Sequence, residues 1–569
     1  MTGPPRTRKV GHGAPDAPVS SPADNGSPIA ESQYRLTDCE VSGEILDAPA
    51  LRRELDLPPD ADASQLLLAA WRHRPAECLQ RMDGALAFAL RTGGTDAWLG
   101  RDPCGLRNLY WYRRADGSVA FDFDLHRLSR QPGVPKRLAR RSLHEYLRFG
   151  DIAAPHTLFE GIHAVEPGQL LHVTPTGVET QTWPVHAGGM QVPSDLPSAV
   201  DRLDTLLGAS VRRQLAGAGH PAAFLSGGVD SSLICALAAR ERGDLVAVTV
   251  GFDGADDEAP AAQRIAKHLG LRHETLRFGH EALVEAFERL AQVMDQPTAD
   301  PATPATVLAF DHCRARYDAV LDGTGADEAV GALPPRHVRV AVQYSSLLPS
   351  PARHALAALL RKVPALAPYT PLVDFEHPAD TMIRWRGFSR PEIENLCGEP
   401  VSFEHTWFYR TFARFPRGAH FERYSALIDA MPCDRLTQAM RASEAPVRYP
   451  FCDREADHFI RRLPADLRHR HGEPKRILRA LLARYVPREL WDGPKRGFTF
   501  PLHDFLAAGD YALVRRYLDR ERWQRRAMLA PDGVRDYAQR FIGGDRQLTF
   551  RVWAMVVLGA WLEAHDEPN

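Results

Sequence analysis

Two patterns of hydrophobic and polar positions divide the chain near residue 190. In the first part, short apolar runs such as 84–90 alternate with glycine-containing turns and helical stretches. Short strands with helices between them predict an α+β domain. In the second part, continuous apolar runs at 222–225, 245–252 and 319–322 alternate with amphipathic helices. This pattern predicts a doubly wound α/β domain, whose ligand crevice lies at the carboxyl ends of parallel strands.

These patterns divide the chain into four segments. Residues 1–33 are rich in Gly, Pro, Ser and Ala, which predicts a disordered tail. The α+β domain is assigned to residues 34–185, a Gly- and Pro-containing linker to 186–197, and the α/β domain with its helical additions to 198–569. A chain of this length can form a separate hydrophobic core in each domain.

Composition excludes several classes of protein. The chain has 569 residues and a formal net charge of −2, so no basic excess indicates nucleic acid as a partner. No apolar stretch is long enough to span a membrane, and the basic amino-terminal segment lacks the apolar core of a secretory signal. The eight cysteines are scattered without a C-x-x-C pair, which disfavours a zinc site or a disulfide framework. We expect a cytoplasmic protein with reduced thiols.

The strongest chemical signal is the segment 223–232, which reads AFLSGGVDSS and joins an apolar run to a helical pattern. Gly227 and Gly228 allow backbone N–H groups to approach phosphate oxygens closely, and the helix start adds positive potential. The flanking serine hydroxyls can donate to phosphate, and Asp230 can hold a magnesium ion. The segment lacks the Gly-Lys-Ser/Thr ending of a P-loop. The alternative is an ordinary Ser/Gly turn between a strand and a helix.

Further motifs follow the order found in one family. They are Gly43-Glu44-Ile45, Arg101-Asp102 with Gly105, 157–162 followed by Pro167-Gly168, then 226–232, 322–328, Pro450-Phe451 with Asp453, Lys475 with Arg479, and 494–498 with Pro501. With these motifs the chain resembles the class B asparagine synthetases over about residues 40–565. The resemblance implies an Ntn-hydrolase-like glutaminase domain followed by an ATP-pyrophosphatase domain of the adenine nucleotide alpha hydrolase-like type.

The resemblance also implies roles for individual residues. ATP would be held by Leu225, Ser226, Gly227, Gly228, Asp230, Ser231, Ser232, Val250, Asp322 and Gly323. Asp230 and Asp327 would bind the magnesium ion that bridges the phosphates. Lys495 would be catalytic, because a fixed ammonium stabilises the charge that gathers on the α-phosphate and the leaving pyrophosphate. Lys475 and Arg496 are weaker candidates.

The first domain departs from the family in the residues that a glutaminase needs. Such an enzyme uses a cysteine directly after the initiator methionine, whose free α-amine is the base beside the thiol. Position 2 is Thr2, Cys39 lacks that amine, and Ser42 replaces the asparagine before Gly-Glu-Ile. We predict a degenerate glutaminase-like domain with a structural or docking role, so that glutamine is not the nitrogen donor. Proteolytic exposure of Cys39 is the alternative.

The second domain departs from the family around the acceptor substrate. Asparagine synthetases usually read Ser-Gly-Glu-Gly where residues 322–325 read DGTG, and no tyrosine matching the base of the related β-lactam synthetases can be placed. The Thr324 hydroxyl without a basic partner is a poor general base, so the amine proton would pass to another group, such as Glu444, or to water. The segment 434–448, which normally faces the acceptor, is also rewritten. These changes beside an intact ATP loop predict an altered amide-forming reaction.

Three enzyme branches of the family fit these features. The favoured branch is the lasso-peptide macrolactam synthetase, in which a precursor peptide's Asp or Glu side chain is adenylated and then attacked by the peptide's own N-terminal amine. The atypical helical region 335–430 would suit such a bulky substrate. The resemblance implies a leader peptidase and a leader-recognition protein as partners. The alternatives are a glutamine-independent asparagine synthetase, a β-lactam-synthetase-like ring-closing enzyme and a non-catalytic ATP-binding scaffold.

Overall fold

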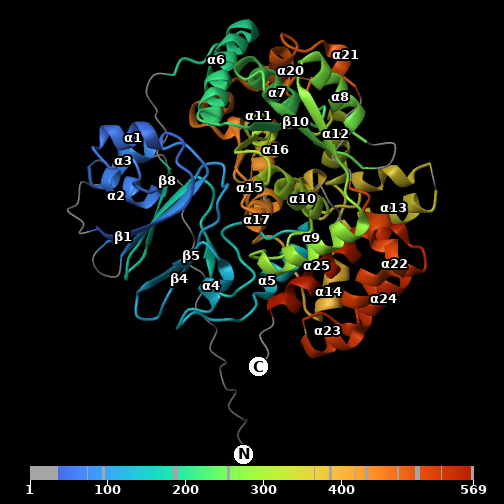
Figure 1. Cartoon of the computed structure of the whole chain (residues 1–569). Helices are drawn as coiled ribbons and strands as arrows, with labels where there is room; N and C mark the ends of the chain where they lie inside the picture. Colours follow the sequence, from blue (N-terminus) through green and yellow to red (C-terminus); the bar gives the residue numbers. More distant parts are fainter. Residues whose placement is uncertain are drawn as a thin grey trace, which may run out of the picture.

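The computed structural model describes residues 36–73, 75–92, 96–183, 190–252, 257–363, 365–383, 387–416, 418–429, 434–470, 473–493, 500–526 and 528–565. They form an amino-terminal domain and a larger carboxy-terminal domain, which pack side by side (Figure 1). The predicted tail at 1–33 and residues 186–189 of the predicted linker lie outside the described residues. Helix α6 (Leu196–Leu215) begins inside the predicted linker, where the Asp195 carboxylate caps it by accepting a hydrogen bond from the Ser198 N–H.

The amino-terminal domain is built from two antiparallel sheets and a layer of helices. Its elements are β1 (Leu36–Gly43), α1 (Ala48–Glu54), α2 (Ala63–His73), α3 (Pro75–Arg81), β2 (Leu86–Thr92), β3 (Ala97–Arg101), β4 (Tyr110–Arg113), β5 (Val119–Asp122), α4 (Leu125–Ser129), α5 (Arg140–Phe149), β6 (His163–Ala164), β7 (Gln169–Val173) and β8 (Val178–Thr182). The sheet orders are β1-β2-β3-β7-β8 and β5-β4-β6.

Side-chain alternation along β2 explains these layers. Leu86, Phe88 and Leu90 belong to the core beneath α1, α2 and α3, whereas Ala87 and Ala89 belong to the core between the two sheets. Successive residues of a strand face opposite sides of the sheet, so one apolar run serves both cores. This places helices on one face of the five-stranded sheet and the three-stranded sheet on the other.

The carboxy-terminal domain contains a five-stranded sheet with the order β11-β10-β9-β12-β13, and each pair of neighbours is parallel. Its first elements are β9 (Pro221–Phe224), α7 (Val229–Glu241), β10 (Val246–Val250), α8 (Ala259–His268), β11 (Arg272–Leu276), α9 (His280–Val293), α10 (Thr303–Arg314), β12 (Ala319–Leu321) and α11 (Ala326–Val330). Ala222 and Val320 face the core that contains α9 and α10, whereas Ala223 and Leu321 face the core that contains α6, α7 and α8. Helices therefore cover both faces, as the prediction of a doubly wound sheet requires.

The remaining chain is mostly helical. It forms α12 (Arg336–Ser345), α13 (Ser350–Arg361), the 3₁₀ helices η1 (Ala367–Leu372) and η2 (Pro378–Met382), α14 (Arg390–Cys397), α15 (Trp407–Ala413), α16 (His420–Asp429), α17 (Asp434–Ser443), β13 (Val447–Arg448), η3 (Pro450–Cys452), α18 (Arg454–Arg462), α19 (Ala465–Arg468), α20 (Arg476–Leu482), α21 (Arg488–Trp491), α22 (Leu502–Tyr517), α23 (Arg520–Arg526), α24 (Pro531–Ile542), η4 (Arg546–Leu548) and α25 (Thr549–His565). Among the described residues, no helix is both long and apolar enough to cross a membrane.

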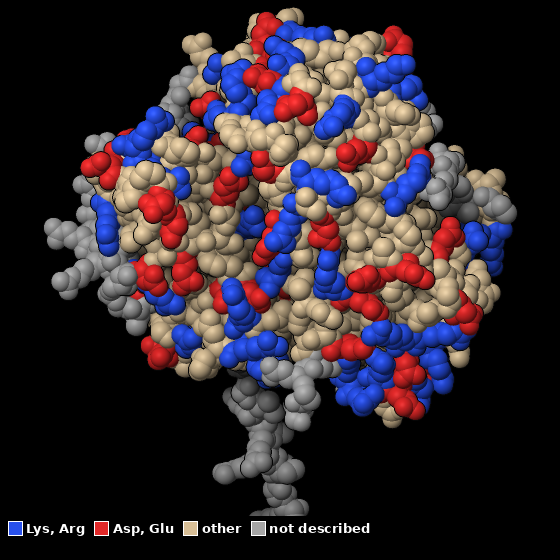
Figure 2. Space-filling view, in the orientation of Figure 1, with Lys and Arg blue, Asp and Glu red and all other residues tan. Residues whose placement is uncertain are grey.

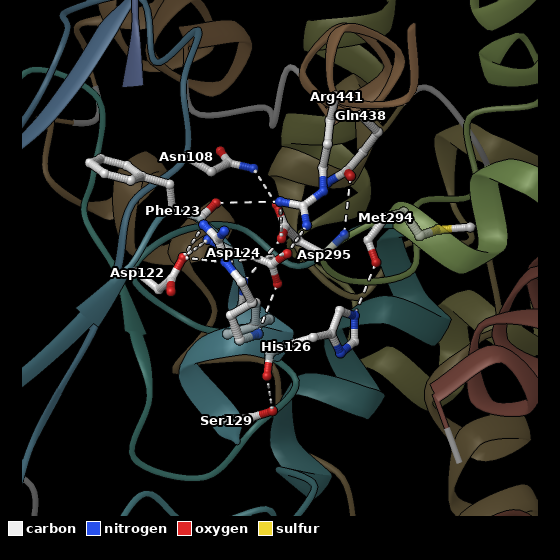
Figure 3. Close-up of polar contacts among 12 residues, drawn as sticks. Asn108, Asp122, Phe123, Asp124, His126, Ser129, Met294, Asp295, Gln438 and Arg441 are labelled. Atoms are coloured by element: carbon white, nitrogen blue, oxygen red, sulfur yellow. Dashed lines mark hydrogen bonds and ion pairs between the residues drawn. The ribbon is translucent and has the colours of Figure 1, made fainter. Parts of the chain in front are cut away.

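A buried polar network joins the two domains around Asp295 (Figure 3). The Asp295 carboxylate lies 2.9 Å from Nη1 of Arg441 and accepts hydrogen bonds from the Leu125 N–H at 3.1 Å and from Nδ2 of Asn108 at 3.4 Å. Arg441 also pairs with Asp124 of the amino-terminal domain. Because Asp295 is 1% exposed, its charge depends on these partners, and the network fixes the domains relative to each other.

Candidate active site

The candidate site lies where the order of the parallel sheet reverses. The chain runs from β9 to β10 and β11 on one side, and then returns to place β12 on the other side of β9. In open α/β sheets, ligands bind outside the carboxyl ends of strands at such a switch point. The loop 225–228 follows β9, and the loop 322–325 follows β12. The structure therefore brings the two predicted ATP loops to the same sheet edge.

The loop after β9 is shaped by its serines and glycines. Ser226 donates its N–H to Oγ of Ser231 at 3.0 Å, and the two hydroxyls lie 2.9 Å apart. Gly227 has a φ of +78°, which favours glycine, and Gly228 is the N-cap of α7 without a side-chain cap. The first N–H groups of α7 therefore lack a side-chain acceptor from their N-cap, and this geometry suits a phosphate group.

The neighbouring positions complete the edge. Leu225 is buried and donates its N–H to the Val248 carbonyl at 2.8 Å, so the loop begins as an extension of the sheet. Ser232 is buried inside α7. Val250 is the half-buried last residue of β10, next to β9 in the sheet. These residues place the loop and its apolar surroundings at the carboxyl ends of two adjacent strands.

The loop after β12 closely approaches the start of α7. A Cβ atom at Gly323 would lie 2.9 Å from the backbone nitrogen of Ser231, so a larger residue would push the two loops apart. Asp322 accepts hydrogen bonds from the Thr324 N–H at 2.8 Å and from the Thr324 hydroxyl at 2.6 Å. The Thr324 hydroxyl thus stabilises the turn through Asp322.

Lys475 joins the two loops. Its ammonium donates to the Asp230 carboxylate in the first turn of α7, and it lies 2.8 Å from Oδ1 of Asp327 in α11. Burial alone would lower the pKa of Lys475, but Asp230 and Asp327 outweigh it and hold the pKa above its usual range. Lys475 also has a φ of +55°, a strained value for a non-glycine residue. The structure thus makes this weaker sequence candidate a central charged group.

The two carboxylates also fit a hard cation. Asp230 and Asp327 contact the same ammonium, so their oxygens converge on one small volume. Among the described residues, no cluster of three or more His, Cys, Asp or Glu side chains could hold a metal. A magnesium ion there would take further oxygen ligands from phosphate and water, which is how Mg²⁺ is usually bound in nucleotide sites.

Two other predicted catalytic residues have different outcomes. Lys495 lies outside the described residues. Glu444 lies near the amino end of β13, and because β13 runs parallel to β12, it is at the sheet edge opposite the candidate site. Its side chain is 75% exposed and lies 3.2 Å from Arg314. The hypothesis that Glu444 is the general base is therefore corrected: the parallel pairing of β13 with β12 places it at the wrong end of the sheet.

A cavity of about 290 Å³ lies between the domains and reaches the second loop. Its lining includes Asn108 from the amino-terminal domain, Trp407 from α15, and Thr324 and Glu328 beside the candidate site. Burial and, to a smaller extent, the neighbouring Asp327 carboxylate raise the pKa of Glu328 to about 7. Glu328 was not among the residues predicted to be functional, although its position in the 322–328 motif was a usable signal.

Cys39 is placed differently from an activated nucleophile. It lies inside β1, opposite Leu90 of β2, and is 9% exposed. Burial, together with the nearby acidic residues Asp38 and Asp62, raises the pKa of its thiol to about 12. Since the thiolate is the nucleophile, this environment suppresses its chemistry.

Comparisons with known proteins agree with this two-domain arrangement. A family model described as a glutamine amidotransferase domain matches residues 18–184, and one described as asparagine synthase matches residues 202–563. The combination defines an ATP-dependent amide ligase. Since the second match covers more than half of the chain, the protein belongs to the asparagine synthase family.

Curated relatives extend over most of the chain. A Mycobacterium bovis protein provisionally named as a glutamine-hydrolyzing asparagine synthetase is 27% identical, covering 85% of this chain and 78% of its own. Glutamine-hydrolyzing asparagine synthetase 1 of Bacillus subtilis is 23% identical, with 91% and 84% covered. Amidase chry2 of Gibberella zeae is 24% identical, with 81% and 76% covered. An NH₃-dependent NAD synthetase structure from Campylobacter jejuni shares 15% identity, covers 24% of this chain and 60% of its own, and has a TM-score of 0.19, too low to support an argument.

Proposed function

We propose that this protein forms an amide by activating a carboxylate as an acyl-adenylate. The observation that carries the proposal is the convergence of Asp230, Lys475 and Asp327 between two loops at the switch point of the sheet. The substrate carboxylate attacks the α-phosphate of ATP and pyrophosphate leaves. An amine then attacks the acyl carbon, forming the amide and releasing AMP and a proton.

Each part of the site has a proposed task in this reaction. The N–H groups at the start of α7 hold phosphate oxygens, and Asp230 and Asp327 hold a magnesium ion, which neutralises phosphate charge when bound. Lys475, positioned by the same carboxylates, stabilises the charge on the leaving pyrophosphate. Lys495 is retained as a second catalytic residue on the strength of its motif.

The acceptor amine is proposed to arrive from the cavity between the domains. Glu328 lines this cavity next to the second loop and is our candidate for receiving the amine proton. Thr324 is a poorer candidate because its hydroxyl is engaged with Asp322. The buried, unactivated Cys39 disfavours ammonia production from glutamine, so the amine belongs to the substrate.

The specific reaction that we propose is macrolactam formation in a lasso precursor peptide. The helical region that lines the cavity with Trp407 and Thr411 supports a substrate larger than an amino acid. The proposal includes a leader peptidase and a leader-recognition protein as partners in the cytoplasm. A second candidate, asparagine synthesis, is favoured by the names of the curated relatives that cover most of the chain.

Pyrophosphate release with magnesium and ATP tests these alternatives. One reaction contains a leader-processed candidate peptide, and the others contain aspartate with ammonia or with glutamine. Peptide-dependent release together with the loss of one water from the peptide, measured by mass spectrometry, is the expected result. Release with aspartate would establish asparagine synthesis instead. ATP binding without pyrophosphate release from any substrate would favour a non-catalytic scaffold.

A further inference from the structure

Exposed large apolar side chains gather on one part of the described structure, the projecting helical hairpin formed by α12, α13 and η1 (residues 336–372). Nine of the ten such side chains among the described residues lie here: Val340, Tyr344, Leu347, Leu348, Leu356, Leu359, Val363, Leu366 and Tyr369. Leu347 is 79% exposed and Tyr344 is 69% exposed. Single exposed apolar residues are normal on a protein surface, but a group of this size indicates a binding surface.

The two faces of the projecting hairpin have different roles. Ala357 and Val342 face inward, and the Arg353 guanidinium lies 4.1 Å from the centre of the Phe375 ring. The Ser345 hydroxyl donates to the Leu372 carbonyl at 2.8 Å, which holds α12 on η1. The inward face is therefore already packed. The exposed apolar residues form an outward stripe with helical spacing, as in an amphipathic helix, and no other part of the described structure covers their apolar face.

The charge of the same segment restricts what can cover it. Residues 329–373 contain five Lys or Arg and two His residues but no Asp or Glu. Arg336 and Lys362 are exposed. The first acidic residue that follows, Asp374, pairs with Arg361 and lies 3.8 Å from His354. Of the five cations, Arg353 is buried and Arg361 is paired, so the exposed cations Arg336 and Lys362, one near each end of the hairpin, are the ones that accompany the apolar residues.

We propose that the projecting hairpin docks on an anionic lipid surface. Leucine and tyrosine side chains flanked by Arg and Lys are the composition that inserts among acyl chains while cations contact anionic headgroups. A second copy of this chain is a poorer fit, because a two-fold interface would place the same cations against each other. Insertion would be shallow and interfacial, in agreement with the absence of a membrane-spanning helix among the described residues.

Docking there would also position the candidate active site. Only residues 331–335 separate α11, which carries Asp327 and Glu328, from the start of α12. Figure 1 places α13 at the rim of the carboxy-terminal domain, on the side away from the amino-terminal domain. A membrane contact at the projecting hairpin would therefore leave the cavity between the domains uncovered. The proposal stands independently of which acceptor substrate the enzyme uses.

Vesicle sedimentation with the full chain tests the proposal. We expect binding to phosphatidylcholine vesicles that contain phosphatidylglycerol, weakening with salt, and little binding to phosphatidylcholine alone. Removing the Arg336 and Lys362 charges as R336Q/K362Q should weaken binding about fivefold for each cation. Leu347→Glu with Leu359→Glu should reduce it at least about tenfold, since both the apolar contact and the charge change. The matched control is Val178→Glu, which changes the one comparable exposed residue in the rest of the described structure and should bind like the parent.

Several results would overturn the proposal. One is equal binding to neutral and anionic vesicles, and another is unchanged binding by the Leu347→Glu/Leu359→Glu variant. Capture of an acidic amphipathic peptide without vesicle binding would assign the surface to a protein partner. If sedimentation velocity shows a dimer of the parent protein, and the Leu347→Glu/Leu359→Glu variant is monomeric, the surface would instead bind a second copy of this chain. Circular dichroism and ATP–pyrophosphate exchange, which do not use the projecting hairpin, verify that each variant is folded.

Discussion

Each of the two domains places a residue with the potential for chemistry beside acidic groups, but the acidic groups have opposite effects on the two residues. The Lys475 side chain is 15% exposed and contacts the carboxylates of Asp230 and Asp327, which keep it protonated and fixed. Cys39 is buried among acidic neighbours that raise the pKa of its thiol, as burial itself does. Burial beside complementary charge prepares a group for electrostatic catalysis, whereas burial beside like charge suppresses a nucleophile. The comparison assigns the chemistry to the carboxy-terminal domain.

The largest effect should come from Lys475→Ala. We expect pyrophosphate release to fall by about a thousandfold or more, because two carboxylates would lose the cation that they position and the phosphates would lose a fixed charge. The measurement is the steady-state rate of pyrophosphate release at saturating ATP. Lys267→Ala removes an exposed lysine from α8 and serves as the control. If the Lys475→Ala enzyme is folded and releases pyrophosphate at the parent rate, the reaction does not take place at the carboxyl edge of the parallel sheet as proposed.

The next effect concerns the step after adenylation. Glu328→Gln should reduce amide formation by about a hundredfold while leaving ATP–pyrophosphate exchange nearly unchanged, because it removes only the proposed acceptor of the amine proton. The pair of assays separates the two half-reactions. Glu444→Gln, at the opposite sheet edge, is a matched control and should alter neither. Equal losses in both assays would instead show that Glu328 supports the ATP site.

The sequence predicted the parts of this site that depend on local backbone chemistry. Gly227 and Gly228 mark a strand-to-helix turn, and apolar runs mark β9, β10 and β12. Because parallel strands end at the same edge of a sheet, the meeting of the two ATP loops at that edge could be predicted. The strand β11 was missed because its exposed and half-buried residues, such as Arg272 and Glu274, hide an edge strand from an apolar pattern. β13 was missed because it has two residues.

Long-range contacts were harder to predict. Lys475 is 245 positions from Asp230, and neither residue carries a local signal of the other. Glu444 was chosen for its chemistry and for its place in a rewritten segment, but only the sheet topology shows which edge it occupies. Such errors arise because the spacing of residues in the sequence shows which of them share one face of a helix or strand. It does not show which distant segments pack against that face.

We expect the amino-terminal domain to stabilise the whole protein through a histidine that packs against the carboxy-terminal domain. His126 in α4 stacks on His565 in α25, with ring centres 3.5 Å apart, and its ring nitrogen lies 3.1 Å from the Met294 carbonyl. Burial lowers the pKa of His126 to about 4. The folded state thus favours the neutral form of His126. The contribution of His126 to the free energy of unfolding is therefore fully present above pH 6.5 and is lost as the pH falls toward 4.

Acidification from pH 7 to pH 5 should therefore lower the free energy of unfolding by about 2 kcal/mol through His126. Chemical denaturation at the two pH values measures the change, and His126→Gln should remove this part of the pH dependence. His73, which is exposed at the end of α2, provides the control His73→Gln. The same pH dependence in the His126→Gln protein would show that this stacked pair does not link the domains energetically.

The smallest effect is expected for Cys39→Ser. The thiol contributes a buried small side chain within β1, so pyrophosphate release and amide formation should change less than about twofold, with at most a modest loss of stability. Glutamate release from glutamine, measured in the same preparations, should be at background with or without Cys39, because a thiol whose pKa is raised to about 12 supplies almost no thiolate at neutral pH. Glutamate release that disappears in Cys39→Ser would reverse the comparison: the amino-terminal domain would then be a working glutaminase, ammonia would be the amine, and the cavity between the domains would be its route to Glu328.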